Sequence, residues 1–173
     1  KSINAEPIAR IQDRKITMLT EDYRKRDKTR KLTLKPEFNE KVALMKFYPS
    51  MNARFIDWCV ENHYKGIILE GTCLGHVGTN CFAPIKNAVE HSLVVGMTSQ
   101  CIWGRVNMNV YDSGRDLQAL GVIPLEDMLP ETALVKLMWV LGQTSNIEEA
   151  KTLLTTNIAN EISPRTLSES TTS

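Results

Sequence analysis

The fold class of this chain is decided by the stretch Lys65-Gly66-Ile67-Ile68-Leu69-Glu70-Gly71-Thr72. Its aliphatic residues, followed by a glycine turn, indicate a short strand. Upstream, the nearly continuous apolar run Val42–Tyr48 ends at Pro49-Ser50 and predicts a strand that is buried on both faces. Downstream, we expect a third strand at Leu93–Thr98 and a brief fourth strand at Gly121–Pro124.

Helical patterns separate these strands along the chain. Phe55, Ile56, Cys59 and Val60 recur at helical spacing after Asn52, which we expect to cap the first helix. The predicted helices are, in order, Asn52–His63, Ala83–Ser92, Arg115–Leu120, Pro130–Gln143 and Ile147–Ile158, the last capped by Asn146. This alternation predicts an α/β fold, a small Rossmann-like or flavodoxin-like three-layer domain at residues 41–162, with a mainly parallel sheet of about four strands.

Residues 1–40 differ from this domain in composition and hydrophobic pattern. Two short β-like runs, Glu6–Ile11 and Lys15–Leu19, predict a hairpin turned at Gln12-Asp13-Arg14. An isolated hairpin is marginally stable, so its partners must come from elsewhere. Tyr23–Pro36 is rich in Lys and Arg and predicts an exposed basic linker. At the other end, residues 163–173 are rich in Ser and Thr and predict a disordered tail.

The composition excludes several classes of function. A net charge of +1, with 42% hydrophobic and 24% charged residues, argues against nonspecific binding to nucleic acid or membrane. No apolar run approaches the roughly 18 residues of a membrane span. Cys59, Cys73, Cys81 and Cys101 lack a metal-ligand spacing, so we expect no metal and reduced, mostly buried thiols in a cytoplasmic protein. The chain opens on Lys1 rather than Met, as a processed product or a fragment would.

The candidate site residues follow the second and third strands, because ligands of such sheets bind at the carboxyl ends of strands. Gly71–His76 combines two glycines with a histidine that can hydrogen-bond or titrate near neutrality. The alternative interpretation is a structural turn in which the backbone satisfies His76. Thr98–Cys101 offers Ser99 or Cys101 as a nucleophile, with His76 as the base.

Other motifs have simpler interpretations. Glu126, Asp127 and Glu131 can do acid–base work or bind a cation, but N-terminal capping of the following helix explains them better. The basic stretch Arg24–Lys35 can contact phosphates, although a solvated linker is the simpler interpretation. Trp139 and Trp58 are expected in a core or an interface, and Trp103 is expected to face a partner.

Several motifs together resemble one family. They are Ser2–Ala9, Lys65–Thr72 with Leu74–Val77, Met97–Cys101, Gly104–Tyr111 and Gly121–Ala133. The chain from Ser2 to about Ile162 resembles the C-terminal half of asparaginase-type amidohydrolases of the type I-like group. Within that group, it resembles the D subunits of the archaeal glutamyl-tRNA(Gln) amidotransferases.

The resemblance implies a glutaminase that hydrolyses glutamine, or asparagine in stand-alone relatives, and releases ammonia. In the amidotransferase, ammonia passes to the E subunit, which uses ATP and Mg to convert Glu-tRNA(Gln) to Gln-tRNA(Gln). The family's catalytic threonines, aspartate and lysine belong to motifs of the form GGTI and HGTDT and a later lysine in the N-terminal domain. Neither motif occurs in this sequence. We therefore expect this chain to hold no catalytic residue and no cofactor, and to be inactive alone.

The implied partners are the N-terminal half of the same polypeptide, a second copy in a dimer, the amidotransferase E subunit and, indirectly, tRNA(Gln). The resemblance gives Thr72, Gly75 and His76 a supporting or neighbouring-subunit role in substrate binding. It places Cys101 at an allosteric position, and it has glycine where this chain has Cys73. Two alternatives remain open here, a noncatalytic assembly domain with the same fold and a fragment of a stand-alone L-asparaginase.

Overall fold

The computed structural model describes residues 7–165 and divides the chain into two compact units, Lys1–Lys35 and Pro36–Ser173. Glu6, which we expected to start the hairpin, lies outside the described residues, as does the predicted tail beyond residue 165. Among residues 7–165, none of the helices has both the length and the apolar character needed to cross a membrane.

The first unit contains the predicted hairpin. Strand β1 (Ala9–Gln12) pairs antiparallel with β2 (Lys15–Met18), and Ile11 lies opposite Ile16. Asp13 and Arg14 both have positive φ, as a two-residue type I′ turn requires. Because side chains alternate between the faces of a strand, the hairpin has an apolar face and a polar face. The apolar face consists of Ala9, Ile11, Ile16 and Met18, and its two isoleucines are 74% and 69% exposed.

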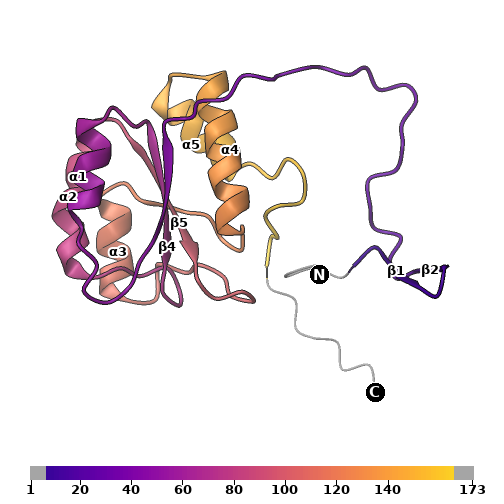
Figure 1. The fold of residues 1–173 in the computed structure, drawn as a ribbon, viewed down its shortest axis with the longest axis horizontal. Coiled ribbons are helices and arrows are strands. Elements are labelled where there is room, and N and C mark those ends of the chain that lie inside the picture. Colours follow the sequence, from indigo (N-terminus) through magenta and orange to yellow (C-terminus); the bar gives the residue numbers. More distant parts are fainter. Residues whose placement is uncertain (1–6, 166–173) are drawn as a thin grey trace. The chain divides into compact units, whose positions relative to one another are not determined.

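The second unit is built on a parallel sheet of four strands in the order β3-β4-β5-β6. The strands are β3 (Val42–Lys46), β4 (Gly66–Gly71), β5 (Val94–Ser99) and β6 (Ile123–Pro124). The predicted fold class is confirmed, and β4 has the bounds expected from its flanking glycines. Figure 1 shows this sheet between two layers of helices.

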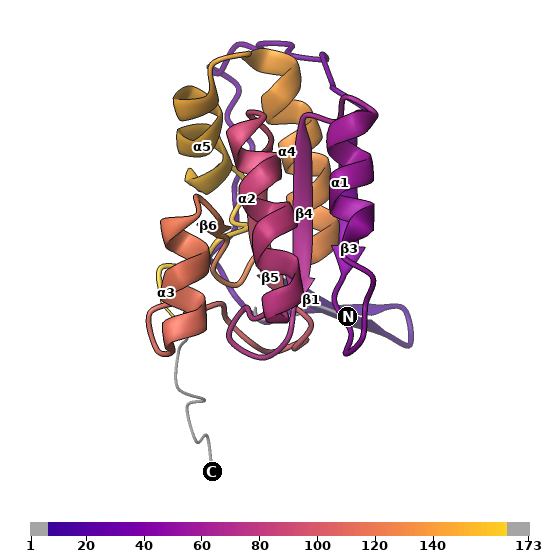
Figure 2. The same cartoon turned by 90° about the vertical axis from the view of Figure 1, so that its left-hand side faces the viewer.

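Helices α1 (Arg54–Glu61), α2 (Phe82–Glu90) and α3 (Asp112–Ala119) cover one face of the sheet, as Figure 2 shows, and a short 3-10 helix, Thr79–Cys81, leads into α2. Helices α4 (Pro130–Gln143) and α5 (Ile147–Thr155) cover the other face. Ile67 and Leu69 of β4 point into the core under α1 and α2, whereas Ile68 points into the core under α4 and α5. The second strand is therefore buried on both faces.

The helix ends confirm some of the expected caps and correct one. Pro130 occupies the first turn of α4, and the Asn146 side chain accepts a hydrogen bond from Glu149 N (3.0 Å) at the start of α5. Asn52, however, does not cap α1. Its side chain accepts a bond from Arg54 N (3.1 Å), two residues on, and the N-cap is Ala53. The asparagine closes a local turn ahead of the helix instead.

The C-terminal segment is held against α4 by a buried ion pair. Lys136 Nζ lies 2.5 Å from a Glu161 carboxylate oxygen and donates to Thr156 O at 2.6 Å. The same carboxylate accepts bonds from the backbone amides of Ile158 and Ala159. We call this arrangement of Lys136 and residues 156–161 the C-terminal clasp. It closes the outside of the α4–α5 layer.

Ser163 was predicted to begin a disordered tail, and this is wrong for that residue. Its amide donates to Asp127 Oδ1 at 2.8 Å, and its carbonyl oxygen accepts from the Arg105 guanidinium. Both contacts reach far back along the chain, so the Ser- and Thr-rich composition did not indicate them.

Candidate functional site

The carboxyl ends of β4 and β5 bring two candidate motifs together. Gly71 is the register partner of Ser99, so the loops that follow these strands begin side by side. Gln100 ties the same edge together, because its side-chain amide donates to Phe47 O (2.5 Å) and to Glu70 O (3.0 Å). The topology therefore brings the two candidate motifs together at this edge of the sheet.

The loop after β4 folds back on itself in a tight turn. Thr72 and His76 form a two-way backbone bridge, with Thr72 N to His76 O at 2.8 Å and His76 N to Thr72 O at 3.0 Å. The Thr72 hydroxyl adds a bond to His76 O at 3.2 Å. Gly75 has a φ of +96°, and a Cβ there would lie 2.9 Å from Val106 Cγ1. The turn therefore requires glycine at this position, both for its conformation and for the space around it.

Cys73 lies in the same turn with a φ of +47°. This left-handed conformation favours glycine over any residue with a Cβ. The residue at which the resemblance gives glycine is thus the one at which this chain holds a strained cysteine.

The His76 ring contacts Ser113 and Tyr111. Its Nδ1 lies 3.2 Å from Ser113 Oγ, and the Tyr111 ring meets it edge-on at a centroid distance of 5.4 Å. Within residues 7–165 the buried Nε2 has no hydrogen-bond partner. A side-chain hydroxyl therefore positions the ring, while the backbone of His76 closes the turn with Thr72.

Ser99 and Cys101 are engaged with the backbone rather than with His76. Ser99 Oγ donates to Cys73 O (2.5 Å) and accepts from Cys101 N (3.1 Å), which links the two loops. Among the described residues, no hydrogen bond joins either side chain to the His76 ring. The structure therefore does not form the Ser–His or Cys–His pair that the sequence left open.

Two of the four cysteines are buried and two are exposed. Cys59 and Cys81 are buried, and burial raises the pKa of both thiols. Cys73 and Cys101 are exposed at the carboxyl-end loops, so the prediction of mostly buried thiols is wrong for this pair. The reason is topological, since both follow strands and lie in the loops of the candidate site.

Two of the three acidic residues near the start of α4 have partners other than the predicted helix N-terminus. Glu126 pairs with Arg105 at 2.8 Å, and Asp127 binds the backbone of Ser163. Only Glu131 lies in the first turn of α4, where a carboxylate favours the helix dipole. In the part of the chain that the structure describes, no group of three His, Cys, Asp or Glu side chains is placed to hold a metal ion.

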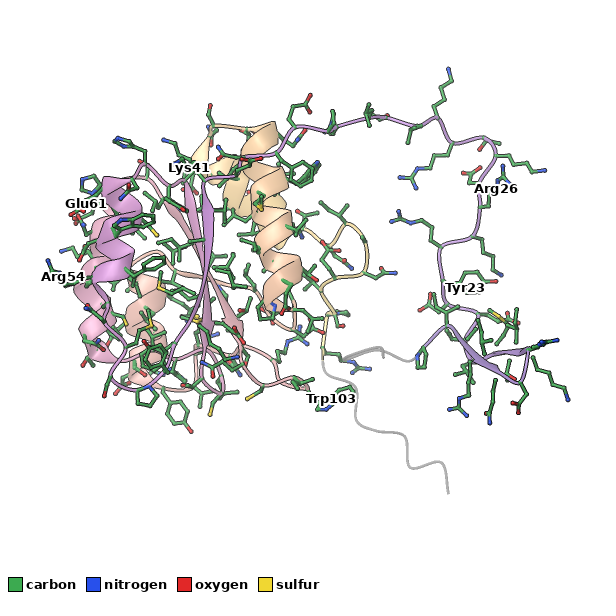
Figure 3. All side chains as sticks on the ribbon, in the orientation of Figure 1. Tyr23, Arg26, Lys41, Arg54, Glu61 and Trp103 are labelled. Atoms are coloured by element: carbon green, nitrogen blue, oxygen red, sulfur yellow. The ribbon has the colours of Figure 1, made fainter. Side chains whose placement is uncertain are left out.

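The three tryptophans also differ in how far they are buried. Trp139 is partly buried and packs against the core cluster on the α4 side of the sheet, whereas Trp58 is 42% exposed. Trp103 is exposed in the loop after β5, at the carboxyl-end edge of the sheet (Figure 3). Two shallow hollows of about 360 and 400 Å³ lie beside α3, and neither includes a residue of the Gly71–Val77 loop.

Comparisons with known proteins agree with this geometry. Residues 41–154 match the family described as the glutaminase/asparaginase C-terminal domain. The chain is 54% identical over 167 residues to the glutamyl-tRNA(Gln) amidotransferase D subunit of Pyrococcus furiosus, and 49% identical to that of Metallosphaera sedula. The match covers 96% of this chain in the first case and 95% in the second, but only 38% of either relative.

Solved structures give the same fold. An L-asparaginase from Thermococcus kodakarensis matches 95% of this chain with a TM-score of 0.82 and 29% identity. L-asparaginase I from Vibrio cholerae matches 94% of it with the same TM-score and 26% identity. This chain covers 50% and 49% of those two chains. It therefore belongs to the glutaminase/asparaginase C-terminal domain family.

Proposed function

We propose that this chain is the C-terminal part of the glutamine-hydrolysing D subunit of a glutamyl-tRNA(Gln) amidotransferase. The observation that carries the proposal is the 54% identity to such a protein over 96% of this chain. The ammonia released would serve the conversion of Glu-tRNA(Gln) to Gln-tRNA(Gln). The complete D subunit is an amidohydrolase in this proposal, and the residues that attack the amide lie outside this chain.

The Gly71–Val77 loop is the part of this chain that would reach the substrate site. Its tight turn holds the His76 ring at the carboxyl-end edge, where Nε2 has no partner among the described residues. A buried ring nitrogen without a hydrogen bond costs about 1–3 kcal/mol, so a group that reaches it would gain that much. A substrate or a backbone group from the N-terminal half would supply this bond. Thr72 and Gly75 would act by shaping the turn.

The hairpin β1–β2 supports the need for an N-terminal half. Its apolar face, defined above by Ala9, Ile11, Ile16 and Met18, is exposed within its own unit. Two strands alone bury too little apolar surface to be stable in water. A sheet of the N-terminal half would cover this face.

The remaining parts of the proposal concern partners. In this proposal the amidotransferase E subunit would hold ATP and Mg. A dimer, an indirect contact with tRNA(Gln) and a cytoplasmic location complete it. Cys101, exposed beside the site, would take the allosteric position.

Ammonia release tests the proposal directly. The chain alone, and then the chain mixed with the N-terminal half of the Pyrococcus furiosus protein, would be assayed with glutamine and with asparagine. We expect no activity from the chain alone and glutamine hydrolysis on mixing. Activity from the isolated chain would overturn the assignment of the chemistry to the other half.

A pair of histidine variants tests the role of the loop in that mixture. His76→Ala is expected to raise KM for glutamine several-fold, because the loop loses the ring that faces the site. His91→Ala is the matched control, since His91 is exposed at the end of α2 and its ring contacts Asn87 O. Equal effects of the two variants would remove His76 from the proposed site.

A stand-alone L-asparaginase is the second candidate. The two L-asparaginases with TM-scores of 0.82 favour it. The same mixture separates the two candidates, because an asparaginase would prefer asparagine over glutamine. If no complementing half restores either activity, the noncatalytic assembly domain is the better description.

A further inference from the structure

Two exposed cysteines follow the ends of neighbouring strands. Gly71 of β4 and Ser99 of β5 are the last register partners of these strands, and Gln100 N extends the ladder with a bond to Gly71 O (2.8 Å). Cys73 and Cys101 each follow that last pair by two residues, so they occupy equivalent positions in the two chains. Both are exposed and both are free thiols.

A single hydroxyl joins the backbones of the two cysteines. Ser99 Oγ donates to Cys73 O (2.5 Å) and accepts from Cys101 N (3.1 Å). Neighbouring strands of a sheet lie about 4.8 Å apart, and a disulfide requires Cα atoms roughly 4.4–6.8 Å apart. Because the serine holds the two chains together beyond the last register pair, the two loops start from a separation that a disulfide can span.

Each cysteine lies in a turn whose backbone is fixed. Cys73 lies in the turn that Thr72 and His76 close with two backbone bonds. Cys101 O accepts a bond from Gly104 N (2.9 Å), and a Cβ built on Gly104 would lie 2.5 Å from Cys101 Cβ. Any side chain at residue 104 would therefore press on Cys101, and the glycine leaves that space open.

Neither packing nor backbone conformation explains the cysteine at residue 73. Its side chain is exposed, so it fills no core, and its φ of +47° disfavours every residue with a Cβ. An exposed thiol in a strained position contributes little to the fold as a free thiol. The chemistry of the sulfur explains Cys73 better, and Cys101 places a second exposed thiol at the equivalent position of the next strand.

We propose that Cys73 and Cys101 form a reversible disulfide that fastens the Gly71–Val77 loop to the loop after β5. The oxidant in this proposal is hydrogen peroxide. One thiol attacks a peroxide oxygen, the O–O bond breaks, and the cysteine becomes a sulfenic acid as water leaves. The second thiol attacks that sulfur, the S–O bond breaks, and a second water leaves. Two thiols are thereby oxidised to one disulfide, and one peroxide is reduced to two waters.

The disulfide would restrain the turn that holds His76. Because this turn also contains Cys73, a bond to the neighbouring loop would limit the movement of the whole Gly71–Val77 loop. The bond would be transient in a reducing compartment and would therefore act as a switch. Cys59 and Cys81 do not compete for the oxidant, because both are buried.

Mass spectrometry of the full 173-residue chain tests the bond without any assay of activity. The reduced chain would be treated with a small molar excess of hydrogen peroxide, unfolded and alkylated. We expect a chain that has lost two hydrogen atoms. Trypsin separates peptide 66–86 from peptide 87–105, so the disulfide joins these two peptides. Fragmentation of the joined pair distinguishes Cys73 from Cys81, which lies in the same peptide.

Three variants and a melting experiment complete this test. C73S and C101S are each expected to abolish the joined peptides, whereas C81A, which removes a buried thiol from the same peptide, should keep them. The oxidised parent chain is expected to melt about 5 °C or more above the reduced chain, because the bond closes a long loop. Dithiothreitol should reverse both changes, and circular dichroism shows whether each variant is folded.

Four results would each overturn the proposal. They are the absence of the joined peptides from the oxidised parent chain, their survival in C101S, a sulfinic acid at either cysteine in place of the bond, and a lower melting temperature after oxidation. The last would mean that the turns must be distorted to bring the two sulfurs together.

The effect of the bond on catalysis rests on the proposed function and is measured separately. In the mixture with the N-terminal half, oxidation is expected to slow ammonia release from glutamine several-fold, and dithiothreitol should restore the rate. C73S should respond to neither reagent, and an equal response of C73S would remove the bond as the cause. No ammonia in either redox state would contradict the proposed function, while the peptide map would still decide whether the disulfide forms.

Discussion

On one side of the sheet the C-terminal segment lies against α4, and α1 lies on the other side (Figure 1). There, α1 leaves an aromatic pair and two charges exposed. Both regions place charged residues on helices. In the C-terminal clasp, Lys136 and Glu161 are 7% and 9% exposed and are paired with one another and with backbone groups. On α1, Arg54 and Glu61 are exposed and have no ion pair within residues 7–165.

The difference shows how the two layers are completed. A buried charge must be satisfied within the fold, because an unpaired one costs several kcal/mol. An exposed charge costs little and remains available to another molecule. The chain therefore completes the α4 layer with its own C-terminal segment, whereas the aromatic pair of α1, Phe55 and Trp58, stays exposed.

The largest expected effect comes from breaking the C-terminal clasp. Lys136→Met leaves the Glu161 carboxylate buried without its partner and is expected to lower the free energy of unfolding by about 3–5 kcal/mol. Lys151→Met is the matched control, because Lys151 pairs with Glu148 on the surface of α5, and its expected cost is about 0.5 kcal/mol or less. Urea denaturation measures both variants. Equal costs would mean that the clasp contributes no more than a surface ion pair.

Acid is expected to open the same clasp. Burial raises the pKa of Glu161, but the Lys136 ammonium and the backbone amides of Ala159 and Ile158 outweigh it and hold the pKa at about 2, below the ordinary 4.5. A lowered pKa stabilises the fold above pH about 4.5 and loses that contribution as the pH falls toward about 2. The contribution is on the order of 3 kcal/mol.

The pH dependence is measured as the difference in unfolding free energy between the parent chain and Glu161→Gln. We expect this difference to be constant above pH about 5 and to shrink between about 4.5 and 2. Glu148→Gln, which removes an exposed carboxylate, should show no such change. A difference that stays flat through that range would show that Glu161 is not the titrating group.

The sequence predicted the elements whose signals are local. Pro130 and the apolar spacing predicted both ends of α4, and two glycines predicted both ends of β4. The bond that Glu149 N donates to the Asn146 side chain spans only three residues. The loop after β4 was also identified, because its glycines and histidine stand together in the sequence. In these regions, neighbouring residues fix the structure.

The partners of the site residues could not be predicted in this way. Ser113, which positions His76, lies 37 residues from it, and Ser163 lies 36 residues from Asp127. Each contact depends on where the sheet places two loops. For Trp58 the sequence left a core and an interface open, because a tryptophan on a helix gives the same pattern in both, and the structure exposes it.

A pair of tryptophan variants sharpens the comparison between the two layers. Trp58→Ala removes an exposed stacked ring and is expected to lower the free energy of unfolding of the monomer by about 1 kcal/mol. Trp139→Ala removes a partly buried ring of α4 that packs against the core, and its expected cost is about 3 kcal/mol. Denaturation at low protein concentration keeps association out of the measurement. Equal costs would show that the outer side of α1 belongs to the core of its own domain.

The smallest effect is an increase in stability from exchanging the charges of α1. In the monomer, R54E/E61R places a carboxylate at the N-terminus and a cation at the C-terminus of the helix, so each exchange should add about 0.3–1 kcal/mol. The melting temperature of the double variant at low concentration and low salt is therefore expected to exceed that of the parent chain. Added salt should reduce the gain, because it screens the helix dipole. If R54E/E61R destabilises the monomer, then Arg54 and Glu61 stabilise α1 where they are.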